Sequence, residues 1–172
     1  MPNKMVKLNR NRATLSPNLC TEVCSLLVDL ADKTATRLNN EIYYPTLYRE
    51  CIYLYMHILS RLVFHEFGGL QRDQFIRQCM DQLIQLLEGQ FDSDQLVEEI
   101  QYREHYYCRY PCLEEHSTDI GFIAHGFNRL LLDNNLPAQL VTRATMLIND
   151  GCLLWLRRLA THQLRLHTDP LL

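Results

Sequence analysis

The spacing of apolar residues along the chain predicts helices almost everywhere. Apolar positions recur every three or four residues in successive segments near 17–38, 45–67, 72–88, 92–110, 118–132 and from 137 onward. An alternating apolar and polar pattern, which is typical of a strand, never lasts long enough to predict one. We therefore expect residues 16–172 to form an all-α, single-domain bundle of six or seven helices.

Residues that favour helix ends mark several of these boundaries. Ser16 followed by Pro17 is typical of a helix start, and Gly68 suits the end of a helix. Asp92 with Gln95 resembles a capping box at the start of the fourth helix. The last helix either breaks at residues 149–151 or runs through them with a kink, which leaves the count at six or seven.

The segment 45–67 is the most apolar of the predicted helices. A membrane span needs roughly 20 mostly apolar residues. Here the uninterrupted apolar run covers only residues 51–56, and Arg61 and Glu66 follow it. A surface helix is polar over about half of its circumference, whereas this one has a much wider apolar arc. We expect it to be the central, most buried helix of the bundle and not a membrane span.

Four polar residues lie in one narrow line on this helix, and we call them the polar stripe: Glu50, His57, Arg61 and His65. Glu50 and Arg61 lie three turns apart, roughly 16 Å by helical rise, so they do not pair directly. The wide apolar arc favours burial, and buried members then need partners from neighbouring helices. The stripe is either a solvent-facing slot with structural ion pairs or the wall of a ligand pocket. Candidate ligand-binding residues are the stripe together with Tyr102 and Tyr106.

The segment 102–116 contains a candidate metal site. His105, Cys108, Cys112 and His116 form a chemically sensible zinc-binding set of two thiolates and two imidazoles. One continuous helix does not allow four ligands to surround an ion, but a turn at Pro111 allows the two halves to fold together. The alternative is a helix end in which the cysteines pack as small apolar residues and the histidines are exposed.

Cysteine and charge content narrow the setting of the protein. The seven cysteines and the lack of an apolar signal core favour reduced thiols in a cytoplasmic compartment. Cys20 and Cys24 share the apolar face of the first helix and are expected to be buried. Residues 1–15 are a basic arm that we expect to be flexible. The net charge of −3 gives no reason to expect nucleic acid as a partner.

The sequence contains no glycine-rich phosphate loop, no nucleophile elbow and no zinc-protease motif. We therefore expect a non-enzymatic, α-helical binding or regulatory protein that acts through contacts with a partner protein or a second copy of itself. The alternative is a small-molecule or metal-binding bundle, with enzymatic activity left open. It would use Glu50, His57 and Arg61 with the segment 102–116. A third hypothesis is a binder of anionic polymers that uses the basic arm.

Overall fold

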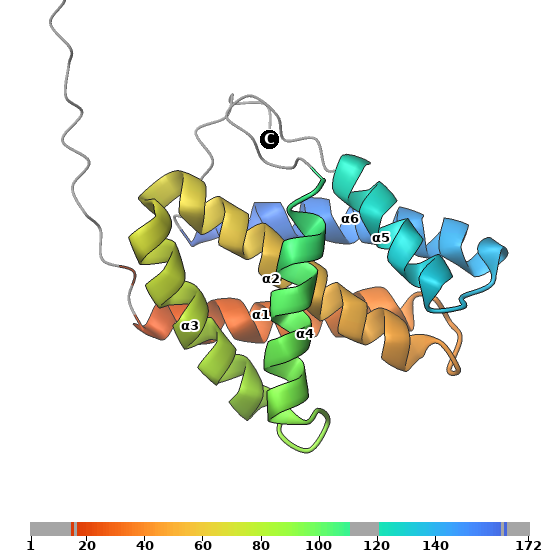
Figure 1. Cartoon of the computed structure of the whole chain (residues 1–172), viewed down its shortest axis with the longest axis horizontal. Helices are drawn as coiled ribbons and strands as arrows, with labels where there is room; N and C mark the ends of the chain where they lie inside the picture. Colours follow the sequence, from red (N-terminus) through yellow and green to blue (C-terminus); the bar gives the residue numbers. More distant parts are fainter. Residues whose placement is uncertain (1–14, 16, 111–120, 163, 165–172) are drawn as a thin grey trace, which may run out of the picture.

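The computed structural model describes residues 15, 17–110, 121–162 and 164, and this part of the chain contains six helices. They are α1 (Pro17–Thr36), α2 (Tyr44–Phe67), α3 (Gly69–Leu86), α4 (Ser93–Tyr107), α5 (Gly121–Asp133) and α6 (Ala138–Thr161). They pack as one bundle (Figure 1), and the described residues include no strand beyond an isolated bridge between Glu88 and Phe91. The all-α bundle is confirmed. Of the basic arm, only Leu15 lies within the described residues.

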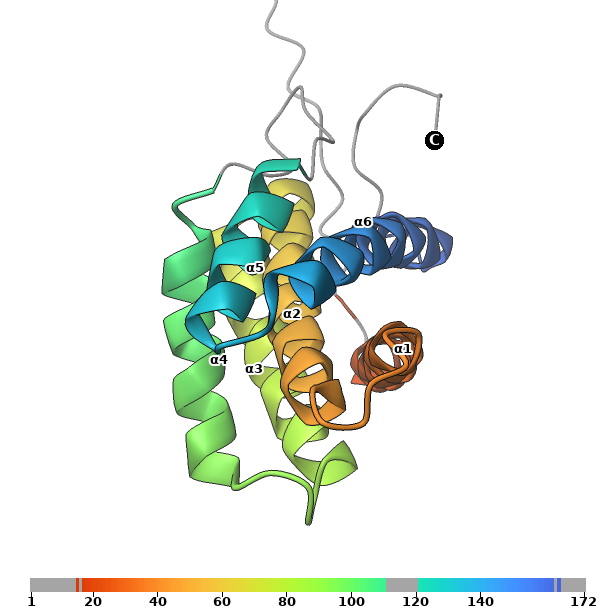
Figure 2. The ribbon, with the colours of Figure 1, turned by 90° about the vertical axis from the view of Figure 1, so that its right-hand side faces the viewer.

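Helix α2 is the centre of the bundle. It contacts each of the other five helices, and Figure 2 shows it with α1 on one side and α4 on the other. Its buried residues run almost without interruption from Leu47 to Val63, so the expectation of a central, most buried helix near 45–67 is confirmed. None of the helices in the described part of the chain has the length and apolar character needed to cross a membrane.

Several helix ends follow the local signals in the sequence. Gly68 ends α2 with a φ of 87°, a left-handed conformation that glycine adopts without strain, and its N–H donates to the Phe64 carbonyl. The Asp92 side chain caps α4 by accepting from the Gln95 amide at 2.9 Å. Helix α3 begins directly at Gly69, three residues earlier than expected, because Gly68 alone makes the reversal.

Helix α6 runs through residues 149–151 without a break because Gly151 is held inside the core. A Cβ atom at Gly151 would overlap the hydroxyl of Tyr55. That hydroxyl lies 3.0 Å from Thr34 Oγ1, which itself donates to the Leu30 carbonyl at 2.7 Å. Trp155, one turn further along α6, donates from Nε1 to the Tyr55 carbonyl at 3.1 Å. Neutral hydrogen bonds and close fit therefore join α1, α2 and α6.

Candidate functional site

The other side of α2 meets α4 through charged side chains. The Glu50 carboxylate accepts two hydrogen bonds from Arg103, from Nε at 2.8 Å and from Nη2 at 2.5 Å. Both side chains are buried, with 4% and 11% of their surface exposed. The guanidinium also lies over the ring of Tyr53, 5.6 Å from its centroid. This bidentate pair fixes the position of α4 against α2.

A second polar group begins at the next residue of α4, and we call it the Glu104 network: His57, Ser60, Arg72 and Glu104. Glu104 Oε2 lies 2.6 Å from His57 Nδ1, and Glu104 Oε1 accepts from Ser60 Oγ at 3.0 Å. Arg72 of α3 donates from Nη1 to Ser60 Oγ at 3.3 Å and lies 3.6 Å from Glu104 Oε1. The network therefore joins α2, α3 and α4 at one point.

The environment of Glu104 decides what this carboxylate can do. Burial alone would raise its pKa, but the hydrogen bonds from His57 and Ser60 and the charge of Arg72 outweigh burial and hold the pKa below its ordinary value. Both oxygens already have partners, so Glu104 is a fixed, ionised acceptor. A carboxylate with a lowered pKa is a weak proton acceptor and a poor general base near neutral pH.

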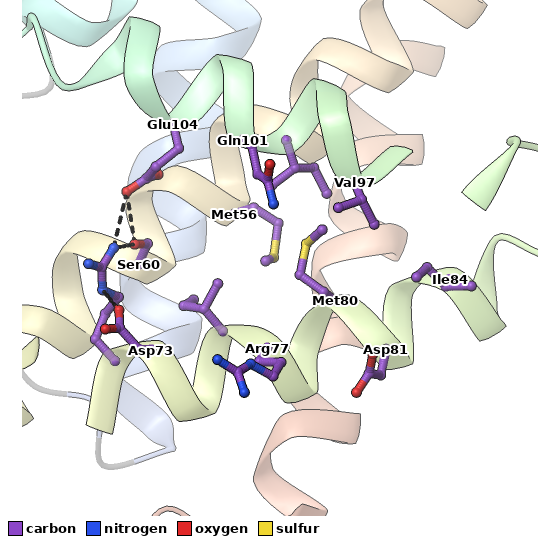
Figure 3. A pocket seen from close by; sticks show the side chains of 13 residues that line it. Met56, Ser60, Asp73, Arg77, Met80, Asp81, Ile84, Val97, Gln101 and Glu104 are labelled. Atoms are coloured by element: carbon purple, nitrogen blue, oxygen red, sulfur yellow. Dashed lines mark hydrogen bonds and ion pairs between the residues drawn. The ribbon is translucent and has the colours of Figure 1, made fainter. Parts of the chain in front are cut away.

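Three members of the Glu104 network, Ser60, Arg72 and Glu104, form the polar end of a pocket of about 490 Å³ between α2, α3 and α4. Figure 3 shows Glu104 and Ser60 at one end of the pocket and Ile84 towards the other. The apolar part of its wall consists of Met56, Ile76, Met80, Ile84, Val97 and Ile100, and Asp73, Arg77, Asp81 and Gln101 complete the lining. The pocket exists because α3 and α4 contact each other much less than either contacts α2.

Charges around the pocket largely cancel. Arg72 lies 2.8 Å from Asp73 as well as near Glu104. Arg77 and Asp81 add one charge of each sign and are both exposed. The pocket therefore offers a mainly apolar wall and a polar end where Arg72 and Glu104 already have partners.

The polar stripe does not form one site. Glu50 and His57 are buried and paired with α4, as expected for buried members of the stripe. Arg61 is only half-buried, and its guanidinium lies over the ring of Phe64, 5.6 Å from the centroid. The expectation that Arg61 is fully buried is therefore wrong, and within the described residues no carboxylate pairs with it. Helix α4 ends at Tyr107 and offers this turn of α2 no carboxylate beyond Glu104.

None of the six candidate ligand-binding residues, the polar stripe with Tyr102 and Tyr106, lines the pocket. His65 is half-buried against the edge of Phe64, with ring centroids 5.9 Å apart. Tyr102 is exposed and lies beneath the guanidinium of Arg103. Tyr106 donates from its hydroxyl to the Gly126 carbonyl of α5 at 3.1 Å. Their role in binding a ligand stays a prediction.

The candidate zinc set is only half described. His105 and Cys108 are exposed at the end of α4, whereas Cys112 and His116 lie outside the described residues. Zinc at these four residues therefore stays a prediction. Among the described residues, two other groups bring metal-ligating atoms within 4.8 Å of one another: Cys20, Cys24 and Cys79, and His57, Glu104 and Cys108. An ion in the second group would have to displace the existing hydrogen bonds of Glu104.

Neither Arg103 nor Glu104 stands out in the sequence as a site residue. The stripe on α2 indicates that partners are required, but α4 carries several acids and nothing in its spacing selects Glu104. Ser60 lies one turn from His57 on the same helix, so its position in the sequence could have indicated that it belongs to this site.

In comparisons with known proteins, no family model, no curated protein and no solved structure matches this chain.

Proposed function

We propose that this is a non-enzymatic binding protein whose pocket between α2, α3 and α4 takes a small, mainly apolar molecule with a neutral hydrogen-bonding end. The pocket itself carries the proposal. Its volume of about 490 Å³ and its apolar wall with one polar end are typical of small-molecule sites. The thiols of the described part form no disulfide, which supports a reducing, cytoplasmic setting.

The wall of the pocket supports an apolar ligand. Met56 and Met80 face one another across it (Figure 3), and isoleucine side chains complete the surface. Methionine side chains are unbranched and flexible, so they adapt to ligands of different shape. A ligand that covers these side chains removes apolar surface from water, which is the main source of favourable free energy.

The polar end supports a neutral group in preference to an ion. At the Glu104 end of the pocket, a carboxylate ligand would need Arg72, which already contacts Asp73 and Glu104. An ammonium ligand would need Glu104, whose oxygens already accept hydrogen bonds. At this end, either ion would have to break an existing pair or be buried without one, and both are costly. A hydroxyl or amide adds a hydrogen bond without either cost.

The same contacts support binding without catalysis. Ser60 is the hydroxyl nearest to a carboxylate in the pocket, and it donates to Glu104 at 3.0 Å. An activated serine needs a base that accepts its proton, and the lowered pKa of Glu104 makes it a poor one. The hypothesis of a protein interface keeps some support from exposed apolar residues. These are distributed over α2 to α6 and the loop before α2, and they identify no single surface.

Three amphiphiles of equal chain length test the proposal: decanol, decanoate and decylamine. We expect calorimetry to show decanol binding most tightly, with a negative change in heat capacity. Tighter binding of either ion would contradict the neutral end. Binding of none of the three would contradict a small-molecule pocket.

A pair of methionine variants locates the binding. Met80→Trp places a larger side chain in the pocket, and we expect it to weaken decanol binding about tenfold or more. Met146→Trp is the control, because Met146 is 67% exposed on α6 and does not line the pocket. Equal affinities of the two variants would place the amphiphile elsewhere.

A further inference from the structure

Three cysteines converge where α1 packs on α3. Cys20 and Cys24 lie one turn apart on α1, and Cys79 faces them from α3. All three are buried, with 1% or less of their surface exposed. Cys20 Sγ lies 3.0 Å from Cys79 Sγ, and all three sulfur atoms lie within 4.8 Å of one another. Ordinary apolar packing does not require three thiols to point at one centre.

The spacing of the three sulfurs suits a metal ion at their centre. An ion about 2.3 Å from each sulfur of a flat triangle holds the sulfurs roughly 4 Å apart. The separation of Cys20 Sγ and Cys79 Sγ, 3.0 Å, is shorter than this value, and no separation exceeds 4.8 Å, so shifts of about 1 Å or less in side-chain positions are sufficient. Soft thiolate ligands select soft ions, above all copper(I). Zinc prefers four ligands in a tetrahedron, and this cluster presents three sulfurs.

We propose that Cys20, Cys24 and Cys79 form a binding site for a monovalent thiophilic metal ion, with copper(I) as its natural occupant. The site is independent of the pocket between α2, α3 and α4. Binding joins α1 to α3 and replaces sulfur-bound protons, which are released to solvent as further thiols coordinate. Affinity therefore rises with pH, and the bound ion stabilises the folded chain.

Access to the buried site runs through the start of α1. Cys20 is the fourth residue of that helix, within the first turn, where backbone N–H groups have no intrahelical partners. Opening of this single turn exposes Cys20 without disrupting α2 or α3, and local opening at helix ends costs little free energy. Cys20 is thus the expected first ligand, followed by Cys24 and Cys79.

Anaerobic titration of the reduced, full-length protein with copper(I), in competition with a coloured copper(I) chelator, tests the site. We expect one ion per chain, an increase in melting temperature, and three sulfur neighbours around copper by X-ray absorption. The X-ray absorption measurement uses the unmodified protein, so its result does not depend on whether any variant folds. Nitrogen or oxygen neighbours, which His57 and Glu104 would supply, would overturn the proposal.

Alanine variants assign the ligands. Cys20→Ala and Cys79→Ala should each weaken copper(I) binding about a hundredfold or more. Loss of a group that only hydrogen-bonds to a metal ligand already costs about tenfold or more in affinity. Cys152→Ala is the matched control, since Cys152 is equally buried but lies outside the cluster. Equal weakening in the control, preferential retention of zinc, or a Cys20–Cys79 disulfide that persists under reductant would each overturn the proposal.

Discussion

The two sides of α2 are joined to the rest of the bundle by different means. Towards α1 and α6, a neutral hydroxyl, a threonine and a glycine meet at a point where no further atom fits. Towards α4, the contacts are a buried ion pair and a carboxylate network. Close fit of the side chains determines the packing on the first side, whereas the identity of the paired charged residues determines it on the second. Removing one hydrogen-bonding group on the neutral side should cost less stability than removing one on the charged side, because the latter leaves a buried ion unpaired.

The largest effect is expected from Arg103→Ala, which leaves Glu50 buried without its counter-ion. Removing one partner of a buried ion pair costs about 3–5 kcal/mol, so the free energy of unfolding should fall by this amount. Urea denaturation followed by circular dichroism measures it. Arg61→Ala is the control and should cost less than about 0.5 kcal/mol, because Arg61 is half-exposed.

A double variant sharpens this result. Replacing both partners, with Glu50→Leu and Arg103→Met, removes the unpaired charge and should recover most of the stability lost in Arg103→Ala. Equal losses for Arg103→Ala and Arg61→Ala would show that the charged side of α2 does not depend on its partners. The contrast between the two sides would then disappear.

On the neutral side, Gly151→Ala should lower stability by about 1–3 kcal/mol through overpacking against the Tyr55 hydroxyl. This loss opposes a gain of up to about 1 kcal/mol, because alanine favours a helix more than glycine does. Thermal melts of Gly151→Ala with and without Tyr55→Phe separate the two effects. If removing the hydroxyl does not reduce the cost of the alanine, the close approach is not the cause.

The smallest effect is a change in pH dependence. The pKa of Glu104 is lower in the folded chain than in the unfolded chain, so its contribution to stability is complete above the ordinary glutamate pKa, near about 4.3. The contribution is lost as pH falls from there through the folded pKa. Glu104→Gln should flatten the dependence of stability on pH in this acid range, by at most about 1.4 kcal/mol per pH unit.

Glu98→Gln provides the comparison for the pH experiment, because Glu98 is exposed on the same helix. Its stability should follow that of the unmodified protein from neutral to acid pH. A slope that is unchanged in Glu104→Gln but reduced in Glu98→Gln would place the acid sensitivity outside the Glu104 network.

The fold was predictable because each of its determinants is local. The apolar period identifies the helices, Gly68 and Asp92 mark two of their ends, and the wide apolar arc of residues 45–67 places that segment at the centre. The burial of Glu50 and His57 followed from the same arc. The sequence around Gly151 permits a helix break or a kink, whereas in the structure α6 is continuous there and Gly151 packs closely against Tyr55.

The candidate site was less predictable because it depends on contacts between helices. The sequence indicates that the polar stripe requires partners, but the choice of Arg103 and Glu104 depends on how α4 crosses α2. Arg61 shares the face of His57 and yet lies beyond the reach of α4. The pocket depends on the looseness of the α3–α4 contact, which no residue pattern records.

Trp155 gives the bundle a built-in optical signal. It is the single tryptophan of the chain, it is fully buried, and its indole donates to a carbonyl 100 residues away in sequence. Its emission therefore follows the docking of α6 onto α2, whereas far-ultraviolet circular dichroism follows helix content. Where the two signals change together during denaturation, the bundle loses its helices and its long-range packing in one cooperative step.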